Sequence, residues 1–312
     1  MQFSHNPEEE IIVLLYEKNY HYGVGAFLNS AVRSQFQGKV VIGYRDELPP
    51  WIDQLLRVGD TTYRIGEMLI TFEQVNPPMH LGYFKPYYLT ETLQKNPICK
   101  KIFFFDADIT VEAPWDFFSE WVENGIALCL DDCFGYLNHH HPWRASWRAL
   151  WGQNVSEGYE VSDYANGGFI GLRRCDKGFL ERWQAFTTKF TDQGGDIHGY
   201  HQRKQWLAIK SDQDLLNATI SVSPDYNYSI IGKEGMGFRY PAYLMIHAVV
   251  HPKPWEANYL VTFLKNLTAP SLGDKAFMKN SQHPIRLFEK KQMFIKKSGI
   301  RIALLASKLI KK

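Results

Sequence analysis

The chain has 312 residues, of which 45% are hydrophobic, so it can bury the core of one large domain or two small ones and is not a disordered polymer. Its formal net charge is +2, yet nine basic residues and only one acidic residue, Glu289, lie between positions 285 and 312, which leaves the rest of the chain acidic. An acidic body argues against a nucleic-acid partner, and no stretch approaches the roughly 20 apolar residues of a membrane-spanning helix.

The cysteines and the first ten residues indicate the cellular compartment in which the protein is expected. The four cysteines, Cys99, Cys129, Cys133 and Cys175, form no Cys-x-x-Cys pair, which argues against a zinc ribbon. Residues 1–10 are polar and acidic, unlike a secretory signal. We therefore expect a cytoplasmic protein with mostly free thiols.

The first elements predict a parallel α/β fold. Residues 11–16 form a short continuous apolar run, which is typical of a strand buried on both faces. Apolar residues between positions 24 and 32 recur at helical spacing, and residues 39–44 form a second strand-like run. A strand, a helix and a strand in this order indicate a right-handed βαβ unit.

The later elements continue the alternation of strands and helices. Residues 81–93 predict a helix with Pro86 in its first turn, and apolar residues between 179 and 190 mark another. Residues 131–164 predict a helical excursion rather than sheet. Further strands are expected at residues 102–105, 126–130, 169–172 and 244–249.

A pair of carboxylates follows one of these strands. Asp106 and Asp108 come directly after the buried strand 102–105. Residues i and i+2 of a strand point to the same side, so both side chains can meet one hard cation. In open α/β sheets, ligands bind beyond the carboxyl ends of the strands, where this Asp-x-Asp motif stands.

The same residues admit a second interpretation. Asp106-Ala-Asp-Ile-Thr110 also fits the pattern of haloacid-dehalogenase-like phosphatases, in which the first aspartate is a nucleophile. That family needs a later acidic pair after a long segment, and Asp131-Asp132 follows too soon. This alternative also leaves the end of the chain unexplained.

The end of the chain carries the most informative spacing. His247 lies in the predicted strand 244–249, and Lys253-Pro-Trp255 begins six residues later. With the motifs that precede it, this His-x5-Lys-Pro-Trp pattern resembles glycosyltransferase family 8, which includes lipooligosaccharide galactosyltransferases and glycogenin. Four further segments resemble family motifs in the same order: Glu17-Lys-Asn-Tyr20, Phe84-Lys-Pro86, Asn166-Gly-Gly168 and Asp212-Gln-Asp-Leu-Leu-Asn217.

This resemblance implies a GT-A-type α/β sandwich, a central and mostly parallel sheet with helices on both faces, over residues 8–280. It implies a retaining glycosyltransferase that moves a hexose from a UDP-sugar to a glycan or glycolipid. It also implies a manganese or magnesium ion held by Asp106, Asp108 and His247, a mixed oxygen and nitrogen set that suits either ion.

The resemblance assigns the remaining site residues as well. Lys85 and Lys253 are expected at the diphosphate, and Asp212 and Gln213 are expected to act catalytically at the donor sugar. The other expected donor-binding residues are Glu17, Asn19, Asp106, Ala107, Asn166, Gly167 and Gly168.

One departure from the family pattern leaves an alternative open. Val250 stands where the family has a glycine that allows close approach of the backbone to phosphate. A nucleotide-sugar-binding homologue without turnover is therefore an alternative, alongside the phosphatase. A nucleotidyltransferase is disfavoured, because no Gly-rich loop follows the first strand.

The last segment, residues 283–312, is expected to form a tail separate from the domain. Apolar residues alternate there with the basic ones, a pattern that favours peripheral contact with an anionic membrane, on the inner face if the protein is cytoplasmic. A helix packed on the acidic body is the alternative.

Overall fold

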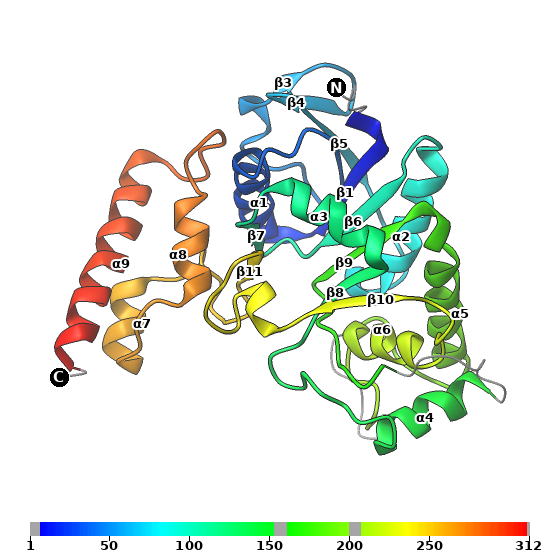
Figure 1. Ribbon diagram of the computed structural model, residues 1–312. Helices are drawn as coiled ribbons and strands as arrows, with labels where there is room; N and C mark the ends of the chain where they lie inside the picture. The colour runs from blue at the N-terminus through cyan, green and yellow to red at the C-terminus, as the bar shows by residue number, and fades with distance from the viewer. Residues whose placement is uncertain (1–6, 153–160, 200–206, 311–312) are drawn as a thin grey trace.

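The computed structural model describes residues 7–152, 161–199 and 207–310 (Figure 1). Its strands are β1 (Glu10–Tyr16), β2 (Lys39–Tyr44), β3 (Leu56–Arg57), β4 (Thr62–Ile65), β5 (Met68–Gln74), β6 (Lys101–Phe105), β7 (Ile109–Val111), β8 (Ile126–Cys129), β9 (Phe169–Arg173), β10 (Tyr228–Ile231) and β11 (Met245–His247). Its α-helices are α1 (His21–Arg33), α2 (Leu81–Lys95), α3 (Trp115–Trp121), α4 (Pro142–Trp151), α5 (Gly178–Asp192), α6 (Asp212–Ser221), α7 (Tyr259–Asn266), α8 (Leu272–Lys279) and α9 (Lys290–Ile310).

The centre of the molecule is a nine-stranded sheet with the strand order β10-β8-β9-β6-β1-β2-β5-β4-β3. β1 pairs in parallel with both β2 and β6, which confirms the predicted βαβ start. Only β9 and β4 run against the common direction, because β9 pairs antiparallel with β6, and β4 with β5. The sheet is therefore mostly parallel, as predicted.

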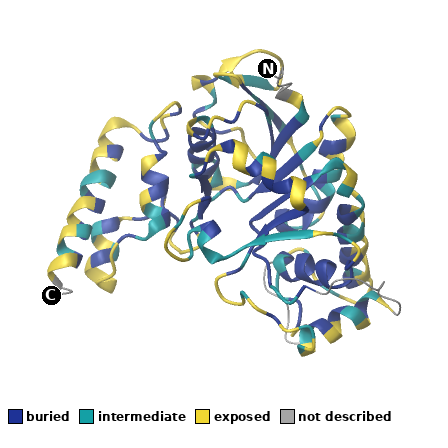
Figure 2. Cartoon of the chain, in the orientation of Figure 1, coloured by how far each residue is buried: buried dark blue, intermediate teal, exposed yellow. Residues whose placement is uncertain are grey.

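Helices cover both faces of this sheet, because alternate residues of a strand point to opposite sides. Ile12 and Leu14 of β1 join the cluster that contains residues of α1 and α3. Ile11 and Val13 join the cluster that contains residues of α2, α4, α5 and α6. Figure 2 shows the central strands as buried, which explains their continuous apolar runs.

Two predictions about these elements need correction. Pro86 is the sixth residue of α2, so it lies beyond the first turn. The helix begins at Leu81 because the His80 side chain accepts a hydrogen bond from the Gly82 N–H at 3.0 Å. The strand predicted at 244–249 is only three residues long, and it pairs with β7 in a separate two-stranded sheet.

The other predicted elements are found, with small shifts at their ends. The excursion within 131–164 contains α4, and residues 153–160 lie outside the described residues. β9 begins directly after Asn166-Gly-Gly168.

The chain ends in three helices that lie together beside the α1 side of the sheet (Figure 1). The segment before α9 is fixed to α1 by the buried side chain of Asn29. Its Nδ2 donates to the carbonyls of Asn280 at 2.7 Å and Ile285 at 2.8 Å, and its Oδ1 accepts from the Ile285 N–H at 2.7 Å. Leu287 and Phe288 belong to the same core cluster as α1, so the first residues of the predicted tail pack on the body.

Candidate active site

A cavity of about 700 Å³ opens at the carboxyl ends of β1 and β6. Five carboxylates and two ammonium groups line it, so the cavity has an excess of negative charge that favours a cation. The charged residues are Glu17, Asp106, Asp108, Asp131, Asp212, Lys85 and Lys253, and they come from segments far apart in the sequence.

The topology of the sheet explains this convergence. Glu17 follows β1, and Asp106 and Asp108 follow β6, its parallel neighbour. β9 runs in the opposite direction, so its first residues lie at the same edge, and the Asp106 N–H donates to the Gly168 carbonyl at 2.7 Å. Asp212 is the first residue of α6. The carboxyl ends of β1 and β6 and the reversed direction of β9 thus bring the predicted residues to the same edge of the sheet.

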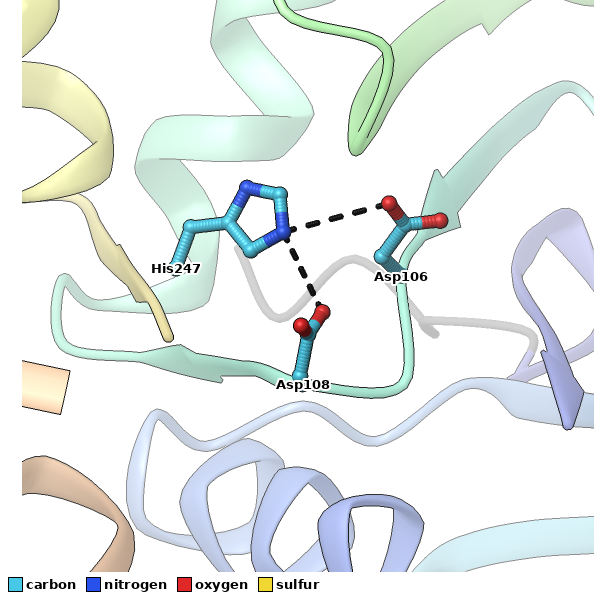
Figure 3. A group of neighbouring side chains, drawn as sticks. All are labelled: Asp106, Asp108 and His247. Atoms are coloured by element: carbon cyan, nitrogen blue, oxygen red, sulfur yellow. Dashed lines mark ion pairs between the residues drawn. The ribbon is translucent and has the colours of Figure 1, made fainter. Parts of the chain in front are cut away.

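Asp106, Asp108 and His247 face one another, as Figure 3 shows. One ligand atom from each lies within 4.8 Å of the others. His247 Nε2 is 3.1 Å from Asp108 Oδ1 and 3.9 Å from Asp106 Oδ2. Across residues 7–152, 161–199 and 207–310 this is the one group of three or more such side chains close enough to hold a metal ion.

Two lysines hold the opposite oxygens of the two aspartates. Lys85 Nζ lies 3.0 Å from Asp106 Oδ1, and Lys253 Nζ lies 2.6 Å from Asp108 Oδ2. Each carboxylate therefore turns one oxygen to an ammonium group and the other to the imidazole of His247. This division leaves one oxygen of each aspartate and one nitrogen for a divalent ion, so these residues fit a metal.

The pKa values of the two aspartates are shifted in opposite directions. Burial raises the pKa of Asp106 above its usual range, despite the nearby ammonium of Lys85. Burial also opposes ionisation of Asp108, but His247 and Lys253 outweigh it and hold the pKa of Asp108 well below its usual range. Asp108 therefore stays ionised to a lower pH than Asp106 does.

Lys85 links three segments of the site. Besides Asp106, its Nζ lies 2.8 Å from Asp212 Oδ2 and donates to the Gly167 carbonyl at 2.8 Å. The side chain is 5% exposed. The pKa of Lys85 is raised because Asp106 and Asp212 outweigh its burial, so it stays an ammonium. Its position at a diphosphate stays a prediction.

The Asn166-Gly-Gly168 segment leaves little space for side chains at its glycines, least of all at Gly168. A side chain at Gly168 would lie 2.6 Å from the His247 ring, and one at Gly167 would lie 3.1 Å from Gln213. The Gly167 N–H donates to Gln213 Oε1 at 2.8 Å, which orients the Gln213 amide at the cavity wall. The segment thus packs directly on two of the predicted site residues.

The predicted nucleotide end of the site is only partly assembled. Glu17 lines the cavity and forms an ion pair with Arg45 at 3.0 Å. Arg45 also donates to the carbonyls of Pro77 and Met79. Asn19 is exposed in the short 3₁₀ helix Lys18–Tyr20 and is not among the lining residues. Every other predicted site residue, Ala107 included, lines the cavity.

Eleven lining residues were not predicted as site residues, and Asp131, Tyr20 and His80 are among them. Asp131 accepts from the Asn166 Nδ2 at 2.9 Å and is 8% exposed. Tyr20 packs edge-on against Trp255, and His80 caps α2. The position of Asp131 after a strand could have indicated it, by the same rule that indicated Asp106.

Comparison with known proteins supports the fold. No protein-family model matches the sequence, and no curated protein matches it. Many solved structures resemble it, among them three that are each 14% identical to it. They are the glycosyltransferase GlyE of Streptococcus pneumoniae TIGR4 (TM-score 0.48, 94% of this chain and 63% of that chain), the bifunctional glycosyltransferase WbbM in its apo form (0.56, 95% and 52%), and the galactosyltransferase LgtC with donor and acceptor sugar analogues (0.50, 91% and 99%).

These likenesses confirm the predicted GT-A-type α/β sandwich, on the strength of WbbM and LgtC. The chain spans about half the length of WbbM and under two thirds of GlyE. At this identity the likeness concerns the fold, and membership of glycosyltransferase family 8 stays a prediction.

Proposed function

We propose that the chain is a retaining glycosyltransferase, which moves a hexose from a UDP-sugar to a glycan or glycolipid with a divalent metal. One observation carries this proposal. Asp106, Asp108 and His247 converge at the wall of a large cavity that is also lined by every predicted donor-binding residue except Asn19. The fold shared with solved glycosyltransferases supports it.

In this proposal Asp106, Asp108 and His247 hold manganese or magnesium. The ion, when bound, supplies positive charge that stabilises the departing nucleoside diphosphate. Lys253 and Lys85 fix the two carboxylates and add positive charge beside the same phosphates. Loss of the diphosphate is the difficult step, so these groups act where charge develops.

In the same proposal, Asp212 and Gln213 bind the sugar. Asp212 is held by Lys85, and Gln213 by the Gly167 N–H, so both polar side chains have a fixed orientation. An amide is a poor nucleophile. We therefore favour attack by the acceptor on the same face from which the diphosphate departs, with retention of configuration, over a stable covalent sugar intermediate.

Val250 is compatible with turnover. Val249 and His251 line the cavity, whereas Val250 is 59% exposed. Val250 is therefore not part of the cavity wall. This placement favours an active enzyme over a homologue that only binds the donor.

We also propose peripheral contact with an anionic membrane through α9. No helix in the described part of the chain is sufficiently long and apolar to cross a bilayer. α9 buries Met293, Ile300 and Ala303 against the body, and its opposite face exposes Phe294 and Leu305. This face, partly exposed in Figure 2, supports contact with a membrane surface.

A donor screen tests the proposed activity. The purified chain is incubated with a panel of nucleotide sugars and manganese, and the released nucleotide is measured. We expect release from a UDP-hexose. Binding of the donor without release or transfer would indicate the binding homologue, and phosphate release from a generic ester would indicate the phosphatase.

A further inference from the structure

A second cavity, of about 340 Å³, lies between residues 282–288 and the first half of α9. It shares no described lining residue with the candidate active site. The buried side chains of Phe288 and Met293 form part of its wall. The glycosyl-transfer proposal makes no use of this cavity.

The polar lining of this cavity is cationic. It contains four permanent cations, Arg286, Lys290, Lys297 and Arg301, together with His283. No acidic side chain of the described residues lines it. Such a concentration of one sign of charge attracts an anion.

These cations are not neutralised within the described parts of the protein. No ion pair there involves Arg286, Lys290 or Arg301, and Lys297 donates to the uncharged amide of Gln282. Lys297 and Arg301 are also four residues apart on α9, where like charges repel and destabilise the helix. A bound anion would relieve that repulsion.

The backbone that carries these side chains is held in place. The Arg286 N–H donates to Gln54 Oε1 at 2.8 Å, and Gln54 Nε2 donates to the Arg286 carbonyl at 2.9 Å. The preceding residue, Ile285, is fixed by Asn29. The backbone at Arg286 is therefore fixed to the body and does not belong to a free tail.

We propose that this cavity binds a phosphate group, carried either by a lipid headgroup or by a soluble phosphorylated ligand. Guanidinium groups match the oxygens of phosphate in two-pronged hydrogen bonds, and two arginines from different segments can grip one group. Lysines add charge at the rim, and Phe288 and Met293 accommodate the apolar part of the ligand.

The experiment compares two double variants that remove the same charge. Arg286→Gln with Arg301→Gln changes the cavity, and Lys291→Gln with Lys308→Gln changes the same helix outside it. Because phosphate could also enter the proposed active site, the buffer contains a chelator, and the two double variants are compared with each other, since neither changes that site. Binding of inorganic phosphate is measured by calorimetry, and binding of phosphatidate in phosphatidylcholine vesicles by sedimentation.

We expect the cavity variant to bind at least about tenfold more weakly than the control variant, since each arginine forms charged hydrogen bonds. If inorganic phosphate binds and the cavity substitutions weaken its binding, the ligand is a soluble phosphate. If only phosphatidate binds in this way, the ligand is a lipid headgroup. If both double variants lost the same amount of binding, net charge alone would explain the loss, and the proposal would be overturned. A parent protein that binds neither probe would also overturn it.

A milder pair of substitutions guards against misfolding. Arg286→Lys with Arg301→Lys keeps the charge and removes the two-pronged geometry. If the cavity variant unfolds, this pair must still weaken phosphate binding severalfold with an unchanged melting temperature, and parent-like binding by it would overturn the proposal.

Discussion

Asp108 has a pKa below that of an ordinary aspartate and is ionised at the candidate metal site, because His247 and Lys253 stabilise its charged form. Asp108→Asn keeps the shape of the side chain and removes its charge. We expect turnover to fall at least about 10²-fold, since charge stabilisation by a metal contributes several kcal/mol. Nucleotide release is measured against manganese concentration.

Asp132→Asn is the control for this variant, because Asp132 pairs with Lys233 and is not among the residues that line the cavity. We expect its turnover to match the parent. Full activity of the parent in excess chelator would exclude the metal from the reaction.

Lys253 and Gln213 are predicted to serve different parts of the donor. Lys253→Ala is expected to weaken binding of free nucleoside diphosphate as well as turnover, because an ammonium at the diphosphate is lost. Gln213→Ala is expected to spare nucleotide binding and to slow transfer. Calorimetry with the nucleotide and a transfer assay measure the two effects separately.

Lys253→Arg controls for structural damage, since Lys253 also holds the buried Asp108. It keeps the charge at that position and should restore part of the nucleotide binding. Two alanine variants that bind and transfer like the parent would show that the assignment is wrong.

His21 is predicted to make the fold sensitive to acid. Burial lowers the pKa of His21 to about 4, and its Nδ1 is buried without a hydrogen-bond partner. The unfolded chain, with a histidine pKa of about 6.5, binds the proton first, so stability is present above pH 6.5 and is lost as the pH falls toward 4. His21→Gln should lessen the loss between pH 7 and 5 by on the order of 1 kcal/mol, after allowance for partial exposure.

Urea unfolding at both pH values measures this effect. Other groups titrate in the same range, so the comparison is the difference between parent and variant at each pH. An identical pH dependence for the two proteins would refute the role of His21.

At the scale of elements, continuous apolar strands were predictable and half-buried ones were not. β1 and β6 are buried almost throughout, so their sequences have no polar interruption. β4 lies near the edge of the sheet and no residue of it is fully buried. β5 is interrupted by Thr71 and Glu73. The pattern of strands at that edge therefore depends on pairing partners, which sequence periodicity does not contain.

The site was predictable where short segments carry it. Asp106 and Asp108 are close in sequence, and a strand end was sufficient to indicate them. The contacts of Lys85 with Asp212 and of Asp131 with Asn166 join distant segments. Those contacts follow from the strand order and from the reversed direction of β9, so the resemblance could suggest residues but not their partners.

Asn29 is predicted to hold the segment before α9 on α1, and its substitution tests this attachment. Asn29→Ala removes three buried hydrogen bonds to Asn280 and Ile285, and leaves backbone groups unpaired. We expect a loss of about 3 kcal/mol in the free energy of unfolding, measured with urea. Asn124→Ala is the control, since Asn124 is exposed and bonds only locally. Equal stability of the two variants would contradict this attachment.

The whole molecule separates its charges, with an acidic body and basic residues gathered at its end. Those basic residues lie beside an apolar stripe on the exposed face of α9, which includes Phe294 at 72%, Leu305 at 63% and Leu309 at 76% exposure. The opposite face of α9 is buried, as expected for a helix packed on the body, and contact with a membrane stays a prediction. The helix packs on the body and still presents an apolar and basic surface.

This surface gives the last prediction. Removing the whole tail would strip Leu287 and Phe288 from the core, so point substitutions are the cleaner test. The triple variant Phe294→Ser, Leu305→Ser and Leu309→Ser should bind anionic vesicles more than about 10²-fold more weakly in a sedimentation assay, because each inserted side chain contributes about 1.5–3 kcal/mol. The unchanged cations still contribute about 1 kcal/mol each. Nucleotide release should be unchanged. Leu56→Ser with Ile98→Ser, exposed elsewhere, should sediment like the parent. A triple variant that sediments normally, or a parent that never sediments at low salt, would exclude the membrane contact.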